Sequence, residues 1–435
     1  MTWLDNPYVG PRPFARSESD RFFGREAEAR ELLSLVVSER LVLLYGQSGA
    51  GKSSLINTRL IPHLQARDFA VLPVGRVSGA LPPGLPHPDN IFALNLMLSL
   101  DQTCREPQRF SHMTLSEFLV GLTSDDGETY SYQEPAEAVE PCESVPYVLL
   151  IDQFEEFITT QPGHWHEREA FFRQLNQALT TDKHLWVVLS LREDYVAALD
   201  PYAALVPNHL RARFQLQRLE CAAALAAVQR PAELTGRPFA PGVAETLVDN
   251  LRQVRMLGQD TLQPGRFIEP VHLQVVCYQL WENLKKAPVG EIRQADLPRD
   301  YVSRALIQFY ETVLHQVAQE TGVAELTLRD WLENNLITEA NTRGTVYRGE
   351  KRTGGLLNEA ADALVKHYLL RTELRAGGTW YELAHDRFIE PIRHSNGSWE
   401  RVRLKRWSDT SFGLAVALLI GALVAVGVDR FSRKG

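Results

Sequence analysis

The chain has 435 residues, enough for about three domains of ordinary size. Hydrophobic residues make up 44% and charged residues 23%, a balance that excludes a wholly disordered chain and favours packed globular domains. The net charge of −8 provides no overall attraction to nucleic acid, although a local basic patch is compatible with it. Four cysteines lie far apart without metal-binding spacing and suit a reducing compartment. No basic-then-apolar signal sequence opens the chain.

The first residues contain several prolines and few apolar residues. Residues 1–20 are therefore expected to form an extended lead-in. The segment Phe22-Phe23-Gly24-Arg25-Glu26 then opens a helical pattern that continues to about Val37.

The most informative segment is a glycine-rich loop between an apolar strand, expected over residues 41–45, and a helix start. Such a loop turns backbone N–H groups around a polyphosphate, at a helix N-terminus whose dipole favours anions. In this arrangement Lys52 reaches the β- and γ-phosphates, and the Ser53 hydroxyl is a ligand of Mg²⁺. The sequence therefore predicts a nucleoside triphosphate site formed by Gly46, Gln47, Ser48, Gly49, Ala50, Gly51, Lys52, Ser53 and Ser54.

Buried strands and helices alternate after the loop. We expect strands over residues 71–74, 147–151 and 186–192, with helices over 92–100 and 115–122 between the first two. This alternation predicts an α/β fold whose parallel sheet carries helices on both faces. The region 124–146 is acidic and lacks Lys and Arg, so we expect an irregular, solvated loop there.

Acidic residues follow the strand at 147–151. Asp152 is predicted to hold Mg²⁺ together with Ser53. Hydrolysis also needs a carboxylate that orients or deprotonates the attacking water. Because the next residue is Gln153, this role falls to Glu155 or Glu156, and we favour Glu155. In the alternative interpretation both are surface carboxylates that suit the dipole of a helix start.

Three arginines near the last of these strands admit two interpretations each. Arg192 ends the strand, where it either contacts the γ-phosphate or pairs with Glu193 or Asp194. Arg211 and Arg213 either act on the nucleotide of a neighbouring subunit or are solvated surface residues.

The second half of the chain changes character. Residues 216–297 have a helical pattern, and further helices follow within 298–398. Near the end of this region, segments 369–375 and 379–383 are expected to form a hairpin like the wing of a winged-helix domain. His385 follows the hairpin, where it either bonds a diphosphate or has a structural role.

An uncharged apolar segment spans residues 412–428, between a basic segment at 399–411 and a short basic tail at 429–435. As a helix it rises roughly 26 Å, slightly short of a hydrocarbon core of ~30 Å. It is predicted to be a single transmembrane helix. The nucleotide site is then cytoplasmic, because ATP is cytoplasmic. A buried core helix is the alternative.

Together these motifs resemble STAND NTPases, the signal-transduction class of P-loop ATPases, and within them the bacterial novel STAND NTPases. The resemblance covers roughly residues 6–393. It rests on NPYVGPRPF at 6–14, FFGRE at 22–26, LYGQSGAGKSSL at 44–55, DQFEE at 152–156, LSLR at 189–192, IEPVHLQ at 268–274 and HD at 385–386.

The resemblance implies a P-loop NTPase core over 21–215, then a helical lid and a winged-helix domain. ADP would hold a closed monomer, and exchange for ATP would permit homo-oligomerisation. The resemblance would place Arg25 near the base or ribose, Pro270 on the lid over the nucleotide, and His385 at the ADP β-phosphate. The Gly-x-Pro lid motif of the family is not matched cleanly, because Pro270 follows Ile268-Glu269.

Three functions are compatible with these features. The leading hypothesis is an ATPase switch anchored in the bacterial inner membrane, with an antiphage role implied by the resemblance alone. A trigger or effector would come from another protein, a lipid or the NTPase surface. The second is an ATPase of the AAA+ origin-recognition kind that binds DNA through its wing, around Arg371 and Arg375. The third is a structural anchor whose ATP only supports folding. The acidic charge and the apolar segment favour the first over the second.

Overall fold

The computed structural model describes residues 6–79, 87–104, 106–134, 145–255, 262–285, 287–288, 290–339, 341–375, 378–399 and 401. The chain divides into two compact units, Met1–Val302 and Ser303–Gly435.

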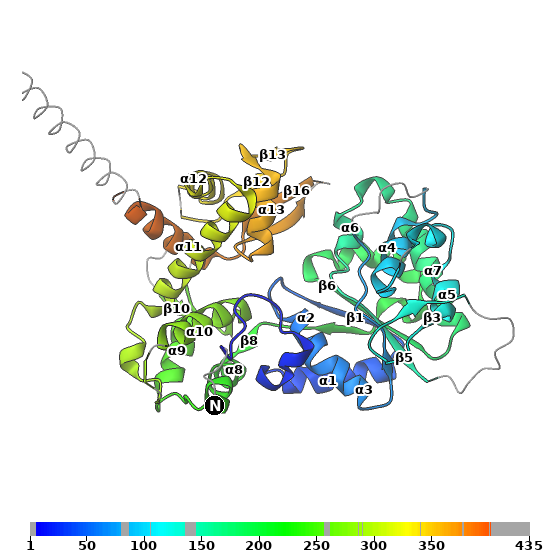
Figure 1. The fold of residues 1–435 in the computed structure, drawn as a ribbon, viewed down its shortest axis with the longest axis horizontal. Coiled ribbons are helices and arrows are strands. Elements are labelled where there is room, and N and C mark those ends of the chain that lie inside the picture. Colours follow the sequence, from blue (N-terminus) through cyan, green and yellow to red (C-terminus); the bar gives the residue numbers. More distant parts are fainter. Residues whose placement is uncertain are drawn as a thin grey trace, which may run out of the picture. The chain divides into compact units, whose positions relative to one another are not determined.

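The first unit is built on a five-stranded parallel sheet with the strand order β2-β5-β6-β1-β7 (Figure 1). The strands are β1 (Leu41–Gly46), β2 (Ala70–Val71), β5 (Tyr147–Ile151), β6 (Leu185–Arg192) and β7 (Arg213–Gln215). The three central strands are apolar along almost their whole length, as expected for strands buried on both faces. The predicted α/β fold with a parallel sheet is confirmed.

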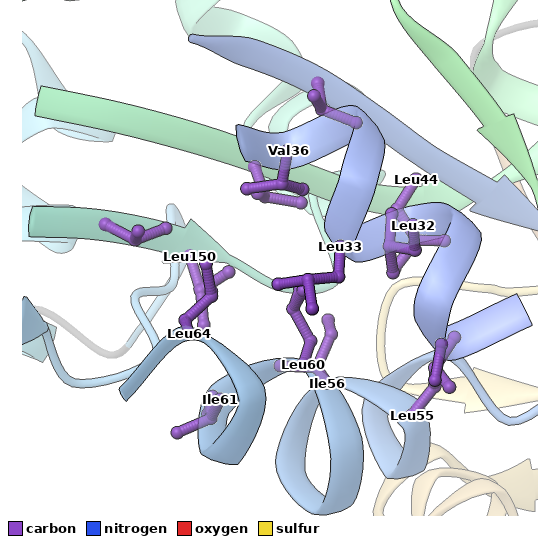
Figure 2. Close-up of a cluster of buried hydrophobic side chains, with 14 of the residues drawn as sticks. Leu32, Leu33, Val36, Leu44, Leu55, Ile56, Leu60, Ile61, Leu64 and Leu150 are labelled. Atoms are coloured by element: carbon purple, nitrogen blue, oxygen red, sulfur yellow. The ribbon is translucent and has the colours of Figure 1, made fainter. Parts of the chain in front are cut away.

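Helices cover both faces of this sheet. On one face lie α1 (Glu26–Ser38), α2 (Lys52–Leu55) and α3 (Ile61–Gln65); Figure 2 shows their apolar side chains packed against Leu44 and Leu150. Figure 1 shows α4 (Ile91–Leu100) and α7 (Glu167–Thr181) on the other side of the sheet, with α5 (Leu115–Gly121) and α6 (Glu156–Thr159) near them. Helices α4 and α5 confirm the two that were predicted there. Aromatic rings from α4, α6, α7 and the turn after β5 pack against one another; they belong to Phe92, Phe154, Phe157, Phe171 and Phe172.

Residues 6–22, named here the N-terminal strap, connect the helical segment of this unit to the helix that follows the phosphate loop. At one end the Asn6 side chain donates to the Tyr278 carbonyl, 3.0 Å away. At the other end the Phe14 N–H donates to Ser54 Oγ at 3.2 Å, and Asn57 donates to the Phe14 carbonyl at 3.0 Å.

Part of the strap is helical, so the expectation of a fully extended lead-in over 1–20 is wrong in that part. Arg16–Arg21 forms a 3₁₀ helix. The Glu18 carboxylate closes its first turn by accepting from the Ala15 N–H at 2.8 Å.

The expected irregular loop over 124–146 is also partly ordered. Strand β3 (Leu122–Thr123) pairs antiparallel with β4 (Ser131–Tyr132). Tyr132 is buried against Phe110 and Phe118, with ring centroids 5.4 and 5.5 Å apart. Asp125, Asp126 and Glu128 therefore occupy the turn of a hairpin that aromatic packing holds in place. Residues 135–144 lie outside the described part.

The segment 216–297 contains the helices α8 (Cys221–Leu234), α9 (Val243–Leu251) and α10 (Pro270–Leu284), as predicted. It also contains two short strand pairs that were not predicted. Strand β8 (Leu219–Glu220) pairs with β11 (Phe267–Ile268), and β9 (Gln253–Arg255) pairs with β10 (Leu262–Pro264). Gly24 lies against the start of α8 at a φ of 83°, where a Cβ would be 2.2 Å from the Ala223 carbonyl oxygen. Only glycine fits there.

The second unit begins two residues into α11 (Tyr301–Thr321) and contains α12 (Glu325–Leu336) and α13 (Asn358–Lys366). Its three-stranded antiparallel sheet has the order β12-β16-β15, with β12 (Thr345–Tyr347), β15 (Leu370–Arg375) and β16 (Gly378–Leu383). A further pair joins β13 (Arg352–Thr353) and β14 (Leu356–Leu357). The β15–β16 pair confirms the predicted hairpin. Arg371, named by the DNA-binding hypothesis, donates to the buried Glu382 carboxylate at 2.5 Å.

Among the described residues, no helix has both the length and the apolar character needed to cross a membrane. The predicted transmembrane segment 412–428 lies outside the described residues, as do most of the basic segment 399–411 and the tail 429–435.

Candidate functional site

The candidate site lies at the carboxyl ends of β1, β5 and β6, the edge of a parallel sheet where ligands bind. Strand β1 ends at Gly46 and α2 begins at Lys52, so the glycine-rich loop connects a strand to a helix as predicted. Gly49 and Gly51 have φ values of 76° and 96°, in the left-handed region that favours glycine. The backbone of the loop can therefore turn its N–H groups toward an anion.

Lys52 folds back over this loop. Its Nζ donates to the carbonyls of Gly46 at 3.0 Å and Gln47 at 3.2 Å. Burial lowers the pKa of Lys52, and the negative charges of Glu155 and Asp152 oppose that shift. A partly buried cation thus lies at the loop, and the charges of two acids act on it.

Both oxygens of the Asp152 carboxylate accept hydrogen bonds from serine hydroxyls. Ser53 Oγ donates to Oδ2 at 2.6 Å, and Ser190 Oγ donates to Oδ1 at 2.7 Å. Asp152 is 4% exposed, so these bonds satisfy a carboxylate that has little access to water. The two predicted Mg²⁺ ligands, Ser53 and Asp152, are therefore in direct contact.

The two candidate bases have different surroundings. Glu155 Oε2 accepts from the Arg192 N–H at 3.2 Å; burial raises the pKa of Glu155, and the charge of Lys52 opposes the rise. Glu156 instead accepts from the Ser78 hydroxyl and lies 3.8 Å from the Arg76 guanidinium. Burial also raises the pKa of Glu156, with Ser78 and Arg76 opposing. Glu155 is the acid whose charge is coupled to the phosphate loop.

Two of the three predicted arginines, Arg192 and Arg213, pair with acids of the protein itself. Arg192 Nη2 donates to Asp194 at 2.7 Å, which is the ion pair that the sequence left open as an alternative. Arg213 lies in β7 and its guanidinium is 3.2 Å from Asp200. Arg211 is exposed. Contact of Arg192 with a γ-phosphate and of Arg211 or Arg213 with a neighbouring subunit stay predictions.

Arg25 supports the phosphate loop from behind. It is 3% exposed, and its guanidinium donates to the Ala50 carbonyl at 3.0 Å, to the Gln217 carbonyl at 2.6 Å and to Glu28 at 2.6 Å. It therefore ties the loop to the chain segment that leads into α8. The position near the base or ribose that the resemblance implies stays a prediction.

The start of α10 lies against the loop, since Pro270 is its first residue and a Cβ at Gly49 would be 3.0 Å from Val271 Cγ2. His385 belongs to the second unit. There it caps the 3₁₀ helix Asp386–Phe388, and its Nδ1 accepts from the Arg387 N–H at 2.9 Å. The roles of Pro270 over the nucleotide and of His385 at a diphosphate stay predictions.

Three polar residues of the site were missed by the sequence analysis: Ser190, Ser78 and Arg76. Ser190 interrupts an apolar run of a buried strand, and a hydroxyl in that setting needs a polar partner. That signal was available. Arg76 lies 3.9 Å from Asp152 as well as 3.8 Å from Glu156, but it follows a two-residue strand that is too short to show a pattern.

These residues fit a magnesium–nucleotide complex. Ser53 and Asp152 offer the hard oxygen ligands that Mg²⁺ prefers. Lys52 and the loop glycines offer the cation and the backbone conformation that polyphosphate binding needs.

A comparison with protein-family descriptions matches residues 7–411 to the family Novel STAND NTPase 1. The chain belongs to this family. The matched range of this STAND NTPase includes the phosphate loop, Asp152, both candidate bases and the hairpin of the second unit. A search of the curated proteins found no match.

Several solved structures are similar to this STAND NTPase. A Walker-type ATPase of Pyrococcus abyssi shares 16% identity, with a TM-score of 0.43, over 88% of this chain and 98% of the other. The Aeropyrum pernix ORC1 protein, solved in complex with DNA, shares 14% over 88% and 95%, with a TM-score of 0.39. The ORC2 protein of the same organism, in ADPNP–ADP complexes, shares 14% over 87% and 95%, with a TM-score of 0.42. At these scores the likenesses do not bear on the function of this chain.

The raised pKa of Glu156 gives stability a defined pH dependence. Because the folded pKa lies above the unfolded one, the stabilising contribution is complete below the ordinary value of 4.5 and is lost as pH rises through the folded pKa. Glutamine does not titrate, so the stability of Glu156→Gln does not contain this pH-dependent contribution. The unfolding midpoint of this variant relative to wild type should therefore rise between about pH 4 and about pH 8.

Thermal unfolding at both pH values measures this difference. Glu117→Gln is the control with the opposite sign, because hydrogen bonds from Thr114 lower the pKa of Glu117. Its midpoint relative to wild type should fall over the same interval. A Glu156→Gln difference that stays constant with pH contradicts the prediction.

Proposed function

We propose that this STAND NTPase binds ATP with Mg²⁺, hydrolyses it slowly to ADP, and uses the exchange of the two nucleotides as a signalling switch. The proposal rests chiefly on one observation: Lys52 lies inside the glycine loop beside Asp152, which is bonded to Ser53. When bound, Mg²⁺ would neutralise phosphate charge, held by Ser53 and Asp152. Lys52 and the loop N–H groups would bind the phosphates.

Glu155 is the better candidate for the general base. Its carboxylate is oriented by the Arg192 N–H, and its raised pKa moves it toward the pH at which a base accepts a proton effectively. In this role Glu155 would orient the attacking water and take its proton. The carboxylate of Glu156 is engaged by Ser78 and Arg76 and would support the site without contacting that water.

The experiment separates binding from chemistry. Lys52→Ala should abolish ATP binding, measured with a fluorescent ATP analogue. Glu155→Gln should retain binding and lower single-turnover hydrolysis by roughly 10²–10⁴-fold, the usual contribution of a general base. Glu156→Gln is the matched control and should stay within about tenfold of wild type.

Retained ATP binding in Lys52→Ala would refute the proposed site. A hydrolysis rate unaffected by both glutamine substitutions would leave ATP binding intact but remove the enzymatic part. That second result would favour a folding or anchoring role for the nucleotide.

The switch part of the proposal is supported by a mechanical connection within the first unit. The N-terminal strap bonds α10 through Asn6 and α8 through Tyr8, whose hydroxyl donates to the Val228 carbonyl at 2.6 Å. Its other end bonds Ser54 and Asn57, in the helix that starts at the phosphate loop. A shift of that helix on nucleotide exchange would thus be passed to α8 and α10.

This connection predicts the rate of nucleotide release. Tyr8→Phe and Asn57→Ala each remove one strap bond, worth about 0.5–1.5 kcal/mol, so fluorescent ADP should dissociate about 2–10 times faster from either variant. Tyr347→Phe is the matched control, since Tyr347 is 55% exposed in the second unit. Release rates equal to that of the control would show that the strap does not restrain the nucleotide site.

We also propose that ATP binding permits homo-oligomerisation and that segment 412–428 anchors the chain in a bacterial inner membrane, with the NTPase in the cytoplasm. The support is the uncharged composition of this segment and its basic flanks. A role in antiphage defence is consistent with this arrangement and rests on the resemblance alone.

The membrane proposal predicts the partition of the full chain. Replacing Leu419 and Leu423 by Arg adds about 2.5–3.5 kcal/mol each at the centre of a span. The double variant should therefore move from the carbonate-resistant membrane pellet to the supernatant. Val120→Arg, at a position that is 69% exposed, is the control and should fractionate as wild type. Wild-type protein found only in the supernatant refutes the anchor.

A further inference from the structure

Strand β6 forms hydrogen bonds to the segment that contains Asp152 and Glu155. Ser190 lies two residues before the end of β6, is 0% exposed, and donates through Oγ to Asp152 Oδ1 at 2.7 Å. The Ser190 carbonyl also accepts from the Phe154 N–H at 2.7 Å. Two residues later, the Arg192 N–H donates to Glu155 Oε2 at 3.2 Å. Three bonds from one strand thus fix the segment that carries both acids.

These hydrogen bonds matter because the backbone between Asp152 and Glu155 has an unfavourable conformation. Gln153 has a φ of 54°, in the left-handed region that residues other than glycine adopt only at a cost. The turn directs Asp152 and Glu155 toward the same edge of the sheet. A strained turn persists only where surrounding interactions fix it. The hydrogen bonds from Ser190 and Arg192 of β6 fix the turn at Gln153.

The hydroxyls of Ser53 and Ser190 are not equivalent. Ser53 belongs to the phosphate-loop helix and would be a metal ligand in the proposed function, so its bond to Oδ2 competes with metal binding. Ser190 is buried behind Asp152 and bonds the other oxygen, Oδ1. Its bond therefore remains when Ser53 is engaged elsewhere.

We propose that Ser190 is a positioning residue for magnesium, holding Oδ1 of Asp152 so that Oδ2 faces Ser53 before any cation arrives. This inference rests on the proposed function. Without the Ser190 hydroxyl, Oδ1 loses the hydrogen bond that fixes it and the carboxylate can rotate. Coordination then requires ordering the carboxylate first. Losses of such supporting bonds typically weaken metal affinity by 10–100-fold.

The test measures how the binding of fluorescent ADP by the full chain depends on Mg²⁺ concentration. Ser190→Ala should raise the half-saturating Mg²⁺ concentration by roughly 10–100-fold. Its turnover at saturating Mg²⁺ should change less than its midpoint, because the metal ligands remain. Ser190→Thr keeps the hydroxyl and should restore the midpoint to within about threefold of wild type.

Two controls separate positioning from loss of stability. Val188→Ala removes buried volume from the same strand without touching Asp152, so it should lower the unfolding temperature and leave the Mg²⁺ midpoint unchanged. Ser111→Ala removes a buried hydroxyl that has no hydrogen-bond partner in the described structure and should alter neither. If Ser190→Ala fails to fold, Ser190→Cys replaces it, and the weaker donor should still raise the midpoint.

The possible failures are distinguishable. Wild-type protein whose nucleotide binding does not respond to Mg²⁺ would refute the proposed function and this inference with it. A wild type that responds, with Ser190→Ala sharing its midpoint, would refute only the role of Ser190. That role is also refuted if Val188→Ala shifts the midpoint as much as Ser190→Ala, since the effect would then come from stability.

Discussion

The arrangement of the site depends on the buried carboxylate of Asp152 and the two hydroxyls that satisfy it. A buried acid is stable only where its oxygens are bonded, and here the donors come from two separate elements. Both donors reach Asp152 only because β6 lies between β1 and β5 in the correct register. That register places Gly46 opposite Arg192 and Ile151 opposite Leu189, so Asp152, the residue after Ile151, comes beside Ser190 on β6.

The same site brings opposite charges together in partly buried surroundings. The buried Asp152 lies close to the partly buried Lys52 and Glu155, and desolvation disfavours the charged form of both Lys52 and Glu155. Their mutual attraction offsets part of that cost. Such a site is prepared for a ligand that carries its own cation and anions, because the ligand completes a charge pattern that the protein leaves partly unbalanced.

The parts of this picture that the sequence predicted are those encoded locally. The glycine loop, the apolar strands, α1, α4, α5 and the late hairpin each show in a window of a few residues. Interactions across long separations could not be predicted in this way. Arg25 was recognised within a motif, but its bond to Gln217 joins residues 192 positions apart.

Composition misled in one region. The acids of 124–146 suggested a solvated loop, whereas the order of its first part comes from Tyr130 and Tyr132, both buried. These two buried aromatic residues order the hairpin despite its charges, because Asp125, Asp126 and Glu128 lie exposed in the turn and need no burial. Ser190 was overlooked for a different reason. A single serine leaves the strand prediction unchanged, and the sequence shows only that its hydroxyl needs a polar partner, not that the partner is Asp152.

The strap also constrains the order in which the chain reaches its final state. Asn6 bonds Tyr278 and Glu282, which are 272 and 276 residues further along. During synthesis the first residues therefore emerge long before their partners exist. The parallel sheet can begin to assemble earlier. The contacts of Asn6 with α10 form only after α10 has left the ribosome, so the first unit completes its fold late in synthesis.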